Sequence, residues 1–347
     1  MPVSPIIDKQ GIQFYYVDTG ELEGIYLTVV LVHGTSMPGG IFRRMLPFAA
    51  AHRLRLVLVN RRGYPGTTPL SESDLDAIAS SDSTTRAGYF EQRALELGKF
   101  MAWFVQKEKI PTYTISQDNK PEGGIVLLGW SSGTTSTIGL LALQDKVPAG
   151  IQAALEPYFR SLCIFDTPRW AFGFSDPPGF YHPMRDASLS PEERLARFQT
   201  WVSGYYAHPD IPSRDIKGLT QQTSPDFAST MDSMTSEEQA SVSYAGAMAV
   251  EALVLSTPPE IYQALLHKTI DKRSADLWPR CKVKMLWGDM SLWEMASGAW
   301  EIERLYESMK ASGDIGRALE SIRMPGANHF FHWDQPDKTC EILSTIL

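Results

Sequence analysis

Short apolar runs, separated by polar or Gly- and Pro-containing segments, recur along the 347-residue chain. Several are apolar at nearly every position, which is typical of strands buried on both faces of a mainly parallel sheet. The runs lie at residues 14–17, 27–32, 54–60, 125–128, 162–165, 283–287 and 319–324. Helix-compatible stretches lie between them, the clearest at residues 89–108. This alternation predicts an α/β fold in which helices flank a central sheet.

The alternation stops in the middle of the chain. Between about residues 168 and 278 no clear strand occurs, and capping boxes predict helices that begin after Ser190 and Thr235. A helical block inserted between two strands of one sheet explains this most simply. The expected division is a discontinuous core domain, residues 1–168 and 279–347, and a helical cap domain, residues 169–278.

Residues 129–133 read Gly-Trp-Ser-Ser-Gly, directly after one apolar run and before a helix-compatible stretch. In a strand–turn–helix context, the pattern G-x-S-x-G forms a nucleophile elbow. The strained turn exposes the serine hydroxyl at a helix N-terminus, and the flanking glycines let strand and helix pack closely. Ser131 is therefore the candidate nucleophile.

Four motifs in this order resemble those of the α/β-hydrolase superfamily. They are His-Gly-Thr at 33–35, Asn-Arg-Arg-Gly-Tyr-Pro-Gly-Thr at 60–67, the elbow at 129–133 and Pro-Gly-Ala-Asn-His at 325–329. The second match is the loosest, because Asn60 replaces the usual aspartate. The resemblance covers the sheet segments, about two thirds of the chain. It implies an α/β-hydrolase fold with a mainly parallel sheet and a helical cap inserted after the sixth strand.

A serine hydroxyl becomes a good nucleophile only when a base takes its proton. His329 is the best candidate, because its Gly-x-Asn-His turn follows the last predicted strand and should end near the elbow. His332, three residues further on, is its nearest rival. We expect His33 to support the oxyanion turn by hydrogen bonding.

The position of the acid is less usual. In the superfamily it generally follows the seventh strand, here residues 283–287, three residues after a glycine; Ser291 occupies that position. Asp289 lies two residues too early and Glu294 three too late. Asp166 follows the sixth strand, where some fungal members, including zearalenone lactonases, carry their acid. Asp166 is therefore favoured, with Asp289 as the alternative.

The oxyanion hole requires two N–H donors aimed at the developing negative charge. The elbow supplies the backbone N–H of Ser132, and the resemblance assigns the second donor to Thr35, with Ser36 as a substitute.

The predicted cap is rich in aromatic and methionine side chains, which favours a mostly apolar substrate. Candidate pocket residues are Trp130 beside the nucleophile, and Trp170 and Tyr205 in the cap.

Composition and charge limit the classes of molecule that the protein is expected to bind. The formal net charge is -8 and no basic run exceeds two residues, which argues against nucleic acid. Neither a signal peptide nor a run long enough to span a membrane is evident, and the three cysteines show no disulfide or metal spacing. These features predict a soluble cytoplasmic protein without a metal or organic cofactor. No feature of the sequence indicates an oligomeric state.

The predicted function is therefore that of a serine hydrolase acting on a carboxylic ester or lactone. The same triad also serves amide or C–C bond cleavage and acyl transfer, because one fold supports many reactions. A dehalogenase or a typical epoxide hydrolase is disfavoured, since both have aspartate where Ser131 stands. A small-molecule-binding protein on the same fold is the non-enzymatic alternative.

Overall fold

The computed structural model describes residues 3–347, which contain a seven-stranded sheet and a two-stranded hairpin. The strand order in the sheet is β1-β3-β2-β6-β7-β8-β9, with β1 antiparallel to β3 and all other neighbours parallel. The sheet strands are β1 (Tyr16–Asp18), β2 (Leu27–Val32), β3 (Leu54–Val59), β6 (Ile125–Trp130), β7 (Phe159–Phe165), β8 (Lys282–Gly288) and β9 (Leu319–Met324); the hairpin pairs β4 (Thr114–Ile115) with β5 (Pro121–Glu122). The predicted α/β-hydrolase fold, with its mainly parallel sheet, is confirmed.

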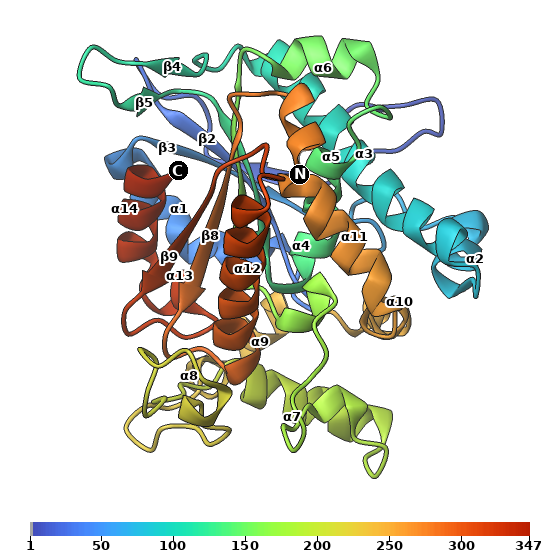
Figure 1. Ribbon diagram of the computed structural model, residues 1–347, viewed down its shortest axis with the longest axis vertical. Helices are drawn as coiled ribbons and strands as arrows, with labels where there is room; N and C mark the ends of the chain where they lie inside the picture. Colours follow the sequence, from blue (N-terminus) through green and yellow to red (C-terminus); the bar gives the residue numbers. More distant parts are fainter. Residues whose placement is uncertain (1–2) are drawn as a thin grey trace.

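Helices cover both faces of the sheet (Figure 1). The strands β2, β3, β6 and β7 are buried throughout, and alternate side chains enter opposite cores: Val30 joins one and Val29 the other. The first core includes α3 (Ser83–Glu108), α5 (Gly139–Ala142), α11 (Pro259–Ile270) and α12 (Trp293–Ala311). The second includes α1 (Leu46–Ala49) and α14 (Pro336–Ile346). The other helices around the sheet are α2 (Glu72–Ala79), α4 (Thr134–Thr137), α6 (Ala149–Leu155) and α13 (Phe331–Asp334).

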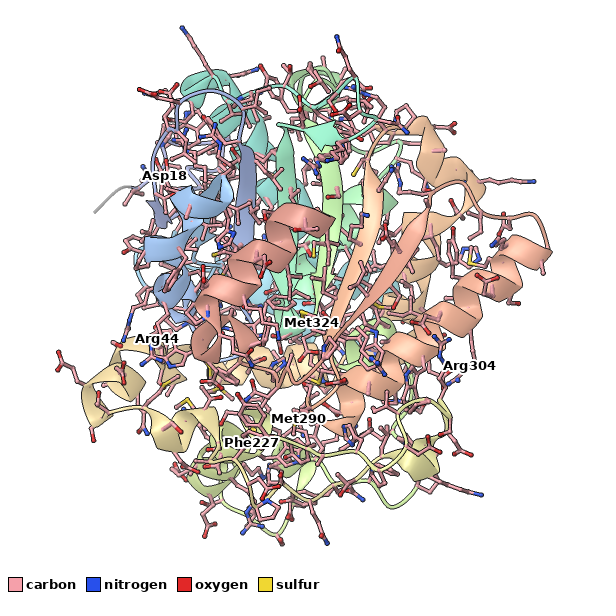
Figure 2. All side chains as sticks on the ribbon, turned by 90° about the vertical axis from the view of Figure 1, so that its left-hand side faces the viewer. Asp18, Arg44, Phe227, Met290, Arg304 and Met324 are labelled. Carbon is pink, nitrogen blue, oxygen red and sulfur yellow. The ribbon has the colours of Figure 1, made fainter. Side chains whose placement is uncertain are left out.

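The parallel register brings the carboxyl ends of the strands to one edge. Trp130, the last residue of β6, pairs with Phe165 of β7, and Phe165 pairs with Leu286 of β8. Met324 ends β9 at the same edge, near Met290 in the loop that follows β8 (Figure 2). Ligands of open α/β sheets bind outside these carboxyl ends, so the loops that follow them are where a site is expected.

The inserted segment between β7 and β8 is helical. It contains α7 (Pro191–Val202), α8 (Thr230–Ser233), α9 (Ser236–Val242) and α10 (Met248–Leu255), and the predicted capping boxes at Ser190 and Thr235 are both present. In Figure 1, α7 and α8 lie beyond the carboxyl edge of the sheet. The last long helix of the segment, α11, packs instead against α5 beside the sheet.

Among the described residues, no single helix has the length and apolar composition to cross a membrane; one pair bent by 84°, Ser236–Leu255 with Pro259–Ile270, meets that test by length and composition only.

Candidate active site

Ser131 lies at the tight turn between β6 and α4. Its φ of +56° places it in the left-handed region, which is strained for a residue with a side chain. A Cβ on Gly129 would lie 2.5 Å from Oγ1 of Thr137, and one on Gly133 would lie 2.5 Å from the carbonyl oxygen of His33. Both positions therefore require glycine, which is the packing that the elbow motif predicts. Ser131 is 8% exposed and lines a cavity.

Asp166 and His329 are hydrogen bonded to each other. Oδ2 of Asp166 accepts a hydrogen bond from Nδ1 of His329 at 2.7 Å, and both side chains are 1% exposed. Because a carboxylate only accepts, Nδ1 carries the imidazole proton and Nε2 is left free to accept another. The structure thus brings together the predicted acid and the predicted base.

Two further donors hold the Asp166 carboxylate. Ser291 donates its hydroxyl to Oδ2 at 2.6 Å, and the backbone N–H of Gly288 donates to Oδ1 at 2.8 Å. Ser291 occupies the position where the superfamily usually has its acid, and here its hydroxyl holds the carboxylate of the predicted acid, Asp166. Asp166 itself has a φ of +44°, so its backbone is bent sharply to direct the carboxylate toward β8.

Asp289, the alternative acid, has other partners. Its Oδ1 accepts the backbone N–H of Gly326 at 2.7 Å, and its Oδ2 lies 3.7 Å from Arg323. These contacts order the turn that leads to His329. The geometry therefore favours Asp166 over Asp289 as the partner of the imidazole.

Trp130 is not a cavity wall, and the expectation that it lines the pocket is corrected. Its ring stacks on His329 with centroids 4.7 Å apart, and its Nε1–H donates to the carbonyl oxygen of His329 at 3.0 Å. The residue is 2% exposed and packs against Phe42 in the core. The side chain at this position of the elbow faces inward, where it contacts His329 instead of the cavity.

His332, the rival base, is fully buried between aromatic rings. Its ring lies 4.8 Å from that of Phe42 and 4.7 Å from that of Trp130, and neither ring nitrogen has a hydrogen-bond partner among residues 3–347. Burial, with a smaller contribution from His329, lowers its pKa well below 6.5. His332 is thus a neutral core residue without access to the cavity.

The loop after β2 carries the predicted oxyanion donors. The backbone N–H of Ser36 already donates to the hydroxyl of Tyr64 at 3.0 Å, so Thr35 is the better candidate. Thr35 lines the cavity, and its hydroxyl lies 2.8 Å from that of Ser132. This hydrogen bond joins the loop directly to the elbow.

His33 holds the same loop through two hydrogen bonds. Its Nδ1–H donates to the carbonyl oxygen of Gly34 at 2.9 Å, and its Nε2 accepts the backbone N–H of Arg61 at 3.0 Å. Both bonds require the neutral ring, and burial, together with the charge of Arg61, lowers its pKa well below 6.5. The predicted supporting role of His33 agrees with these contacts.

Sequence reasoning missed Glu251 of α10. This 5% exposed carboxylate accepts hydrogen bonds from Arg61 at 2.5 Å, the hydroxyl of Tyr64 at 2.8 Å and the hydroxyl of Thr35 at 2.9 Å. Burial opposes the charged guanidinium of Arg61, but the adjacent carboxylate raises its pKa. Glu251 thus links the inserted segment to the oxyanion loop. The available signal was a single acid within the otherwise apolar run 248–255.

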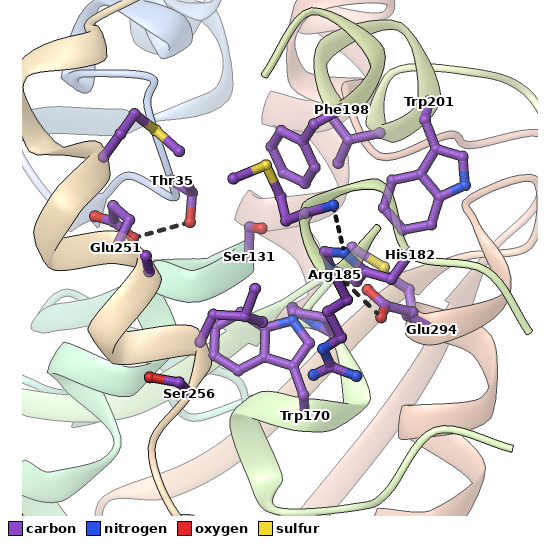
Figure 3. A pocket seen from close by; sticks show the side chains of 17 residues that line it. Thr35, Ser131, Trp170, His182, Arg185, Phe198, Trp201, Glu251, Ser256 and Glu294 are labelled. Carbon is purple, nitrogen blue, oxygen red and sulfur yellow. Dashed lines mark hydrogen bonds and ion pairs between the residues drawn. The ribbon is translucent and has the colours of Figure 1, made fainter. Parts of the chain in front are cut away.

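The cavity beside Ser131 has a volume of about 210 Å³ and mostly apolar walls. Its apolar and aromatic lining consists of Pro168, Trp170, Met184, Phe198, Trp201, Val202, Met248, Ala252, Leu255 and Met295. Trp170 lies in it as expected (Figure 3). Tyr205 does not: its hydroxyl donates to Asp334 at 2.6 Å and its ring stacks on Phe227, which corrects its assignment to the pocket. Tyr205 anchors the inserted segment to α13 instead.

Besides Glu251, two further buried ionisable groups line the cavity, His182 and Glu294. Burial raises the pKa of Glu294 to about 8, although Arg185 and Arg169 partly oppose the shift. Burial lowers the pKa of His182 to about 4. Both side chains are therefore mostly uncharged near neutral pH, and neither has a role in the Asp166–His329 pair. Within residues 3–347, no group of three or more His, Cys, Asp and Glu side chains is arranged to hold a metal ion.

Residues 29–342 match the family described as "Alpha/beta hydrolase family". Three solved structures share the fold. An esterase from Exiguobacterium antarcticum is 14% identical, with a TM-score of 0.51, and the match covers 98% of this chain and 97% of that one. A mutant epoxide hydrolase from Vigna radiata is 13% identical, with a TM-score of 0.51 and coverages of 99% and 97%, and a structure from work on carboxylesterases of the thaumarchaeon Nitrososphaera gargenis is 13% identical, with a TM-score of 0.50 and coverages of 99% and 96%. The comparison with curated proteins finds no match to this sequence.

Glu294 should make the protein less stable as the pH rises. Its pKa moves from 4.5 to about 8 on folding, so between these values the folded state keeps a proton that the unfolded state has released. The free energy of unfolding should therefore fall through this window by up to about 1.4 kcal/mol per pH unit. Chemical denaturation of the wild-type protein and of Glu294→Gln across the window measures the difference, which should shift steadily in favour of the variant.

The comparison with Glu294→Gln isolates this one group. His182 has the opposite effect, because its lowered pKa adds stability as the pH rises from about 4 to 6.5. His182, Arg185, Arg169 and Tyr206 all face Glu294, but they are present in both proteins, and their effects largely cancel in the difference. Parallel pH profiles for the two proteins would contradict the prediction.

Proposed function

The chain belongs to the α/β-hydrolase family, and from that premise we propose that it is a serine hydrolase that cleaves a carboxylic ester or lactone of a mostly apolar small molecule. The observation that carries the proposal is the 2.7 Å hydrogen bond between Asp166 and His329, beside an elbow that presents Ser131 to an apolar cavity. An acid–base pair and a strained serine turn at the same edge of the sheet supply the groups that acyl transfer requires.

In the proposed mechanism, Ser131 attacks the substrate carbonyl while Nε2 of His329 takes its proton. Asp166 keeps the imidazole in the required tautomer and stabilises the imidazolium that forms. The backbone N–H groups of Thr35 and Ser132 donate to the oxyanion. His329 then returns the proton to the leaving oxygen, and water cleaves the acyl-enzyme. These steps require no metal or organic cofactor.

The cavity supports an apolar substrate, because most of its wall is aliphatic or aromatic. The location of the acid after β7, the strand predicted at residues 162–165, supports a relationship to fungal members such as zearalenone lactonases and hence a lactone substrate. Chemistry that uses an aspartate nucleophile is disfavoured, since Ser131 occupies that position. We further propose that the inserted segment, residues 169–278, acts as a lid over the site.

Ser131 should react with a fluorophosphonate probe. An activated serine displaces fluoride and forms a stable bond to phosphorus, so the wild-type protein should be labelled once per chain. Ser131→Ala should remove labelling completely, and mass spectrometry of the intact protein measures both. Ser256→Ala is a matched control, because Ser256 also lines the cavity but its hydroxyl donates to the carbonyl oxygen of Leu253. An unlabelled wild-type protein would favour a binding protein over an enzyme.

Asp166→Asn should lower kcat by about 10³- to 10⁴-fold while the fold is retained, because an amide N–H facing Nδ1 selects the wrong imidazole tautomer. Asparagine also tolerates the left-handed backbone at this position. Asp289→Asn is the control and should change kcat little, since its amide oxygen can still accept the N–H of Gly326. Hydrolysis of p-nitrophenyl esters of several chain lengths, and of small and macrocyclic lactones, provides the assay. The reverse order of effects would assign the acid to Asp289.

The two neighbouring histidines should behave differently. His329→Ala removes the proposed base and should abolish detectable turnover in the same assay. His332→Leu fills a buried apolar site with a side chain of similar size, so it should retain activity within about tenfold and keep or raise the melting temperature. Loss of turnover in a folded His332→Leu protein, with activity retained in His329→Ala, would exchange the two assignments.

A further inference from the structure

A pair of buried polar side chains lies across the cavity from the elbow. Figure 3 shows Ser131 and Thr35 on one side, and His182 and Glu294 on the other. Glu294 lies in the first turn of α12, and His182 immediately precedes a short helical turn in the inserted segment. The proposed mechanism uses neither residue, and both are among the few polar groups in a mostly apolar wall.

The Glu294 carboxyl group lacks the partners that a buried polar group normally has. The residue is 1% exposed, and its Oε1 has no hydrogen-bond partner among residues 3–347. Nε2 of His182 lies 3.8 Å from this Oε1, too far for a hydrogen bond. Leaving such a group unpaired costs free energy, so its retention in a cavity wall calls for a partner that comes from outside the chain.

The hydrogen bonds of His182 fix which of its ring nitrogens is the donor. Nδ1 accepts the backbone N–H of Met184 at 3.2 Å, so in the neutral ring the proton resides on Nε2. Its stacking with Phe198 and contact with Trp201, at centroid distances of 6.2 Å and 5.1 Å, hold the ring in place. His182 therefore presents an N–H donor toward the unpartnered Oε1 of Glu294.

Nε2 and Oε1 are 3.8 Å apart, too close for an oxygen between them, so a bridging oxygen would lie beside the line that joins them, within the cavity that both side chains line. An oxygen atom about 2.8 Å from both Nε2 and Oε1 would have normal hydrogen-bond lengths to each. A hydroxyl matches the two groups, because its oxygen can accept from Nε2–H of His182 while its proton is donated to Oε1 of Glu294. A carbonyl oxygen can only accept, so it pairs with both groups only when the Glu294 proton is on Oε1, whereas a hydroxyl pairs with both whichever oxygen carries that proton.

Charge also favours a neutral group. Arg185, the cation on this wall, is already ion-paired with Asp176. Burial keeps Glu294 mostly protonated near neutral pH, since its pKa is raised to about 8. The surrounding side chains, Trp170 and Met295 among them, suit an apolar body that carries the hydroxyl.

We propose that His182 and Glu294 form a subsite that binds a hydroxyl group on an otherwise apolar substrate, at the side of the cavity opposite Ser131. The subsite deepens the proposed hydrolase function and rests on it, because it selects which ester or lactone is held against the nucleophile. It would orient the substrate through one hydroxyl that takes no part in the reaction.

Binding is tested first, without turnover, in the Ser131→Ala protein. The probes are ethyl phenylalkanoates of increasing chain length. Their phenyl ring is unsubstituted or carries a hydroxyl group in the meta or para position, a methoxy group or an aminomethyl group. Calorimetry gives the Kd of each ester. At the chain length and ring position that reach the subsite, the hydroxyl ester should bind at least about tenfold more tightly than its hydrogen and methoxy counterparts.

Variants then identify the groups responsible. Glu294→Leu should remove the preference for the hydroxyl ester over the unsubstituted ester, measured as the ratio of their Kd values, whereas Glu294→Gln, which can still accept, should retain most of it. His182→Phe keeps the ring stacking, removes the donor and should also lower the preference. Glu307→Leu is the control, because Glu307 lies on the exposed side of the same helix, where it pairs with Lys310.

Hydrolysis of the same esters by the otherwise wild-type protein separates the two proposals. The expected result is that Glu294→Leu loses the preference for the hydroxyl ester over the unsubstituted ester, and that the loss appears mainly in the ratio of their KM values rather than in the ratio of their kcat values. A hydroxyl preference of equal size in the wild-type, Glu294→Leu and His182→Phe proteins would overturn the subsite. So would a wild-type protein that shows no hydroxyl preference, or one that prefers the aminomethyl ester to the hydroxyl ester. If every ester binds and none is hydrolysed, the proposed function fails while the binding result still stands.

Discussion

The Asp166 carboxylate joins the ends of three parallel strands, and the geometry of the site depends on it. It follows β7, accepts the backbone N–H of Gly288 and the hydroxyl of Ser291 after β8, and accepts Nδ1–H of His329 in the loop after β9. A carboxylate with three short hydrogen bonds is well compensated for the loss of water. The position of the imidazole is therefore set by the register of the sheet as well as by its own loop.

The inserted segment contributes to the same geometry from the other side. Asn328, next to the base, donates to the carbonyl oxygen of Ser203 and to the hydroxyl of Thr230, and His208 is hydrogen bonded to the carbonyl oxygen of Ser291. The loop that contains Ser291 and the loop that contains His329 are thus held between the sheet and the inserted segment. A change in how this segment packs would alter the site without touching Ser131.

The parts of the site that the sequence predicted are those encoded by neighbouring residues. The elbow, the turn before His329 and the capping boxes are local patterns, and Asp166 could be found because the usual position of the acid holds Ser291. The orientation of Trp130 could not be predicted, since the same motif allows its side chain to face the core or the cavity. In the folded chain the side chain faces the core, where it stacks on His329. Glu251 with Arg61, and Glu294 with His182, are pairs separated by more than 100 residues, and only the folded chain brings them together.

Two buried carboxyl groups, those of Glu251 and Glu294, line the cavity, and a third, that of Asp166, lies at the carboxyl edge of the sheet; the three have different partners. Asp166 and Glu251 each accept three hydrogen bonds, and one of the three to Glu251 comes from the guanidinium of Arg61. Glu294 has no such partners at Oε1 and is kept mostly neutral by burial. A charged group beside the substrate would cost desolvation free energy on every binding event, whereas a neutral one can exchange hydrogen bonds with a hydroxyl at little cost. Glu294 is thus an uncharged group in a mostly apolar cavity wall, in a protein that has an excess of acidic residues.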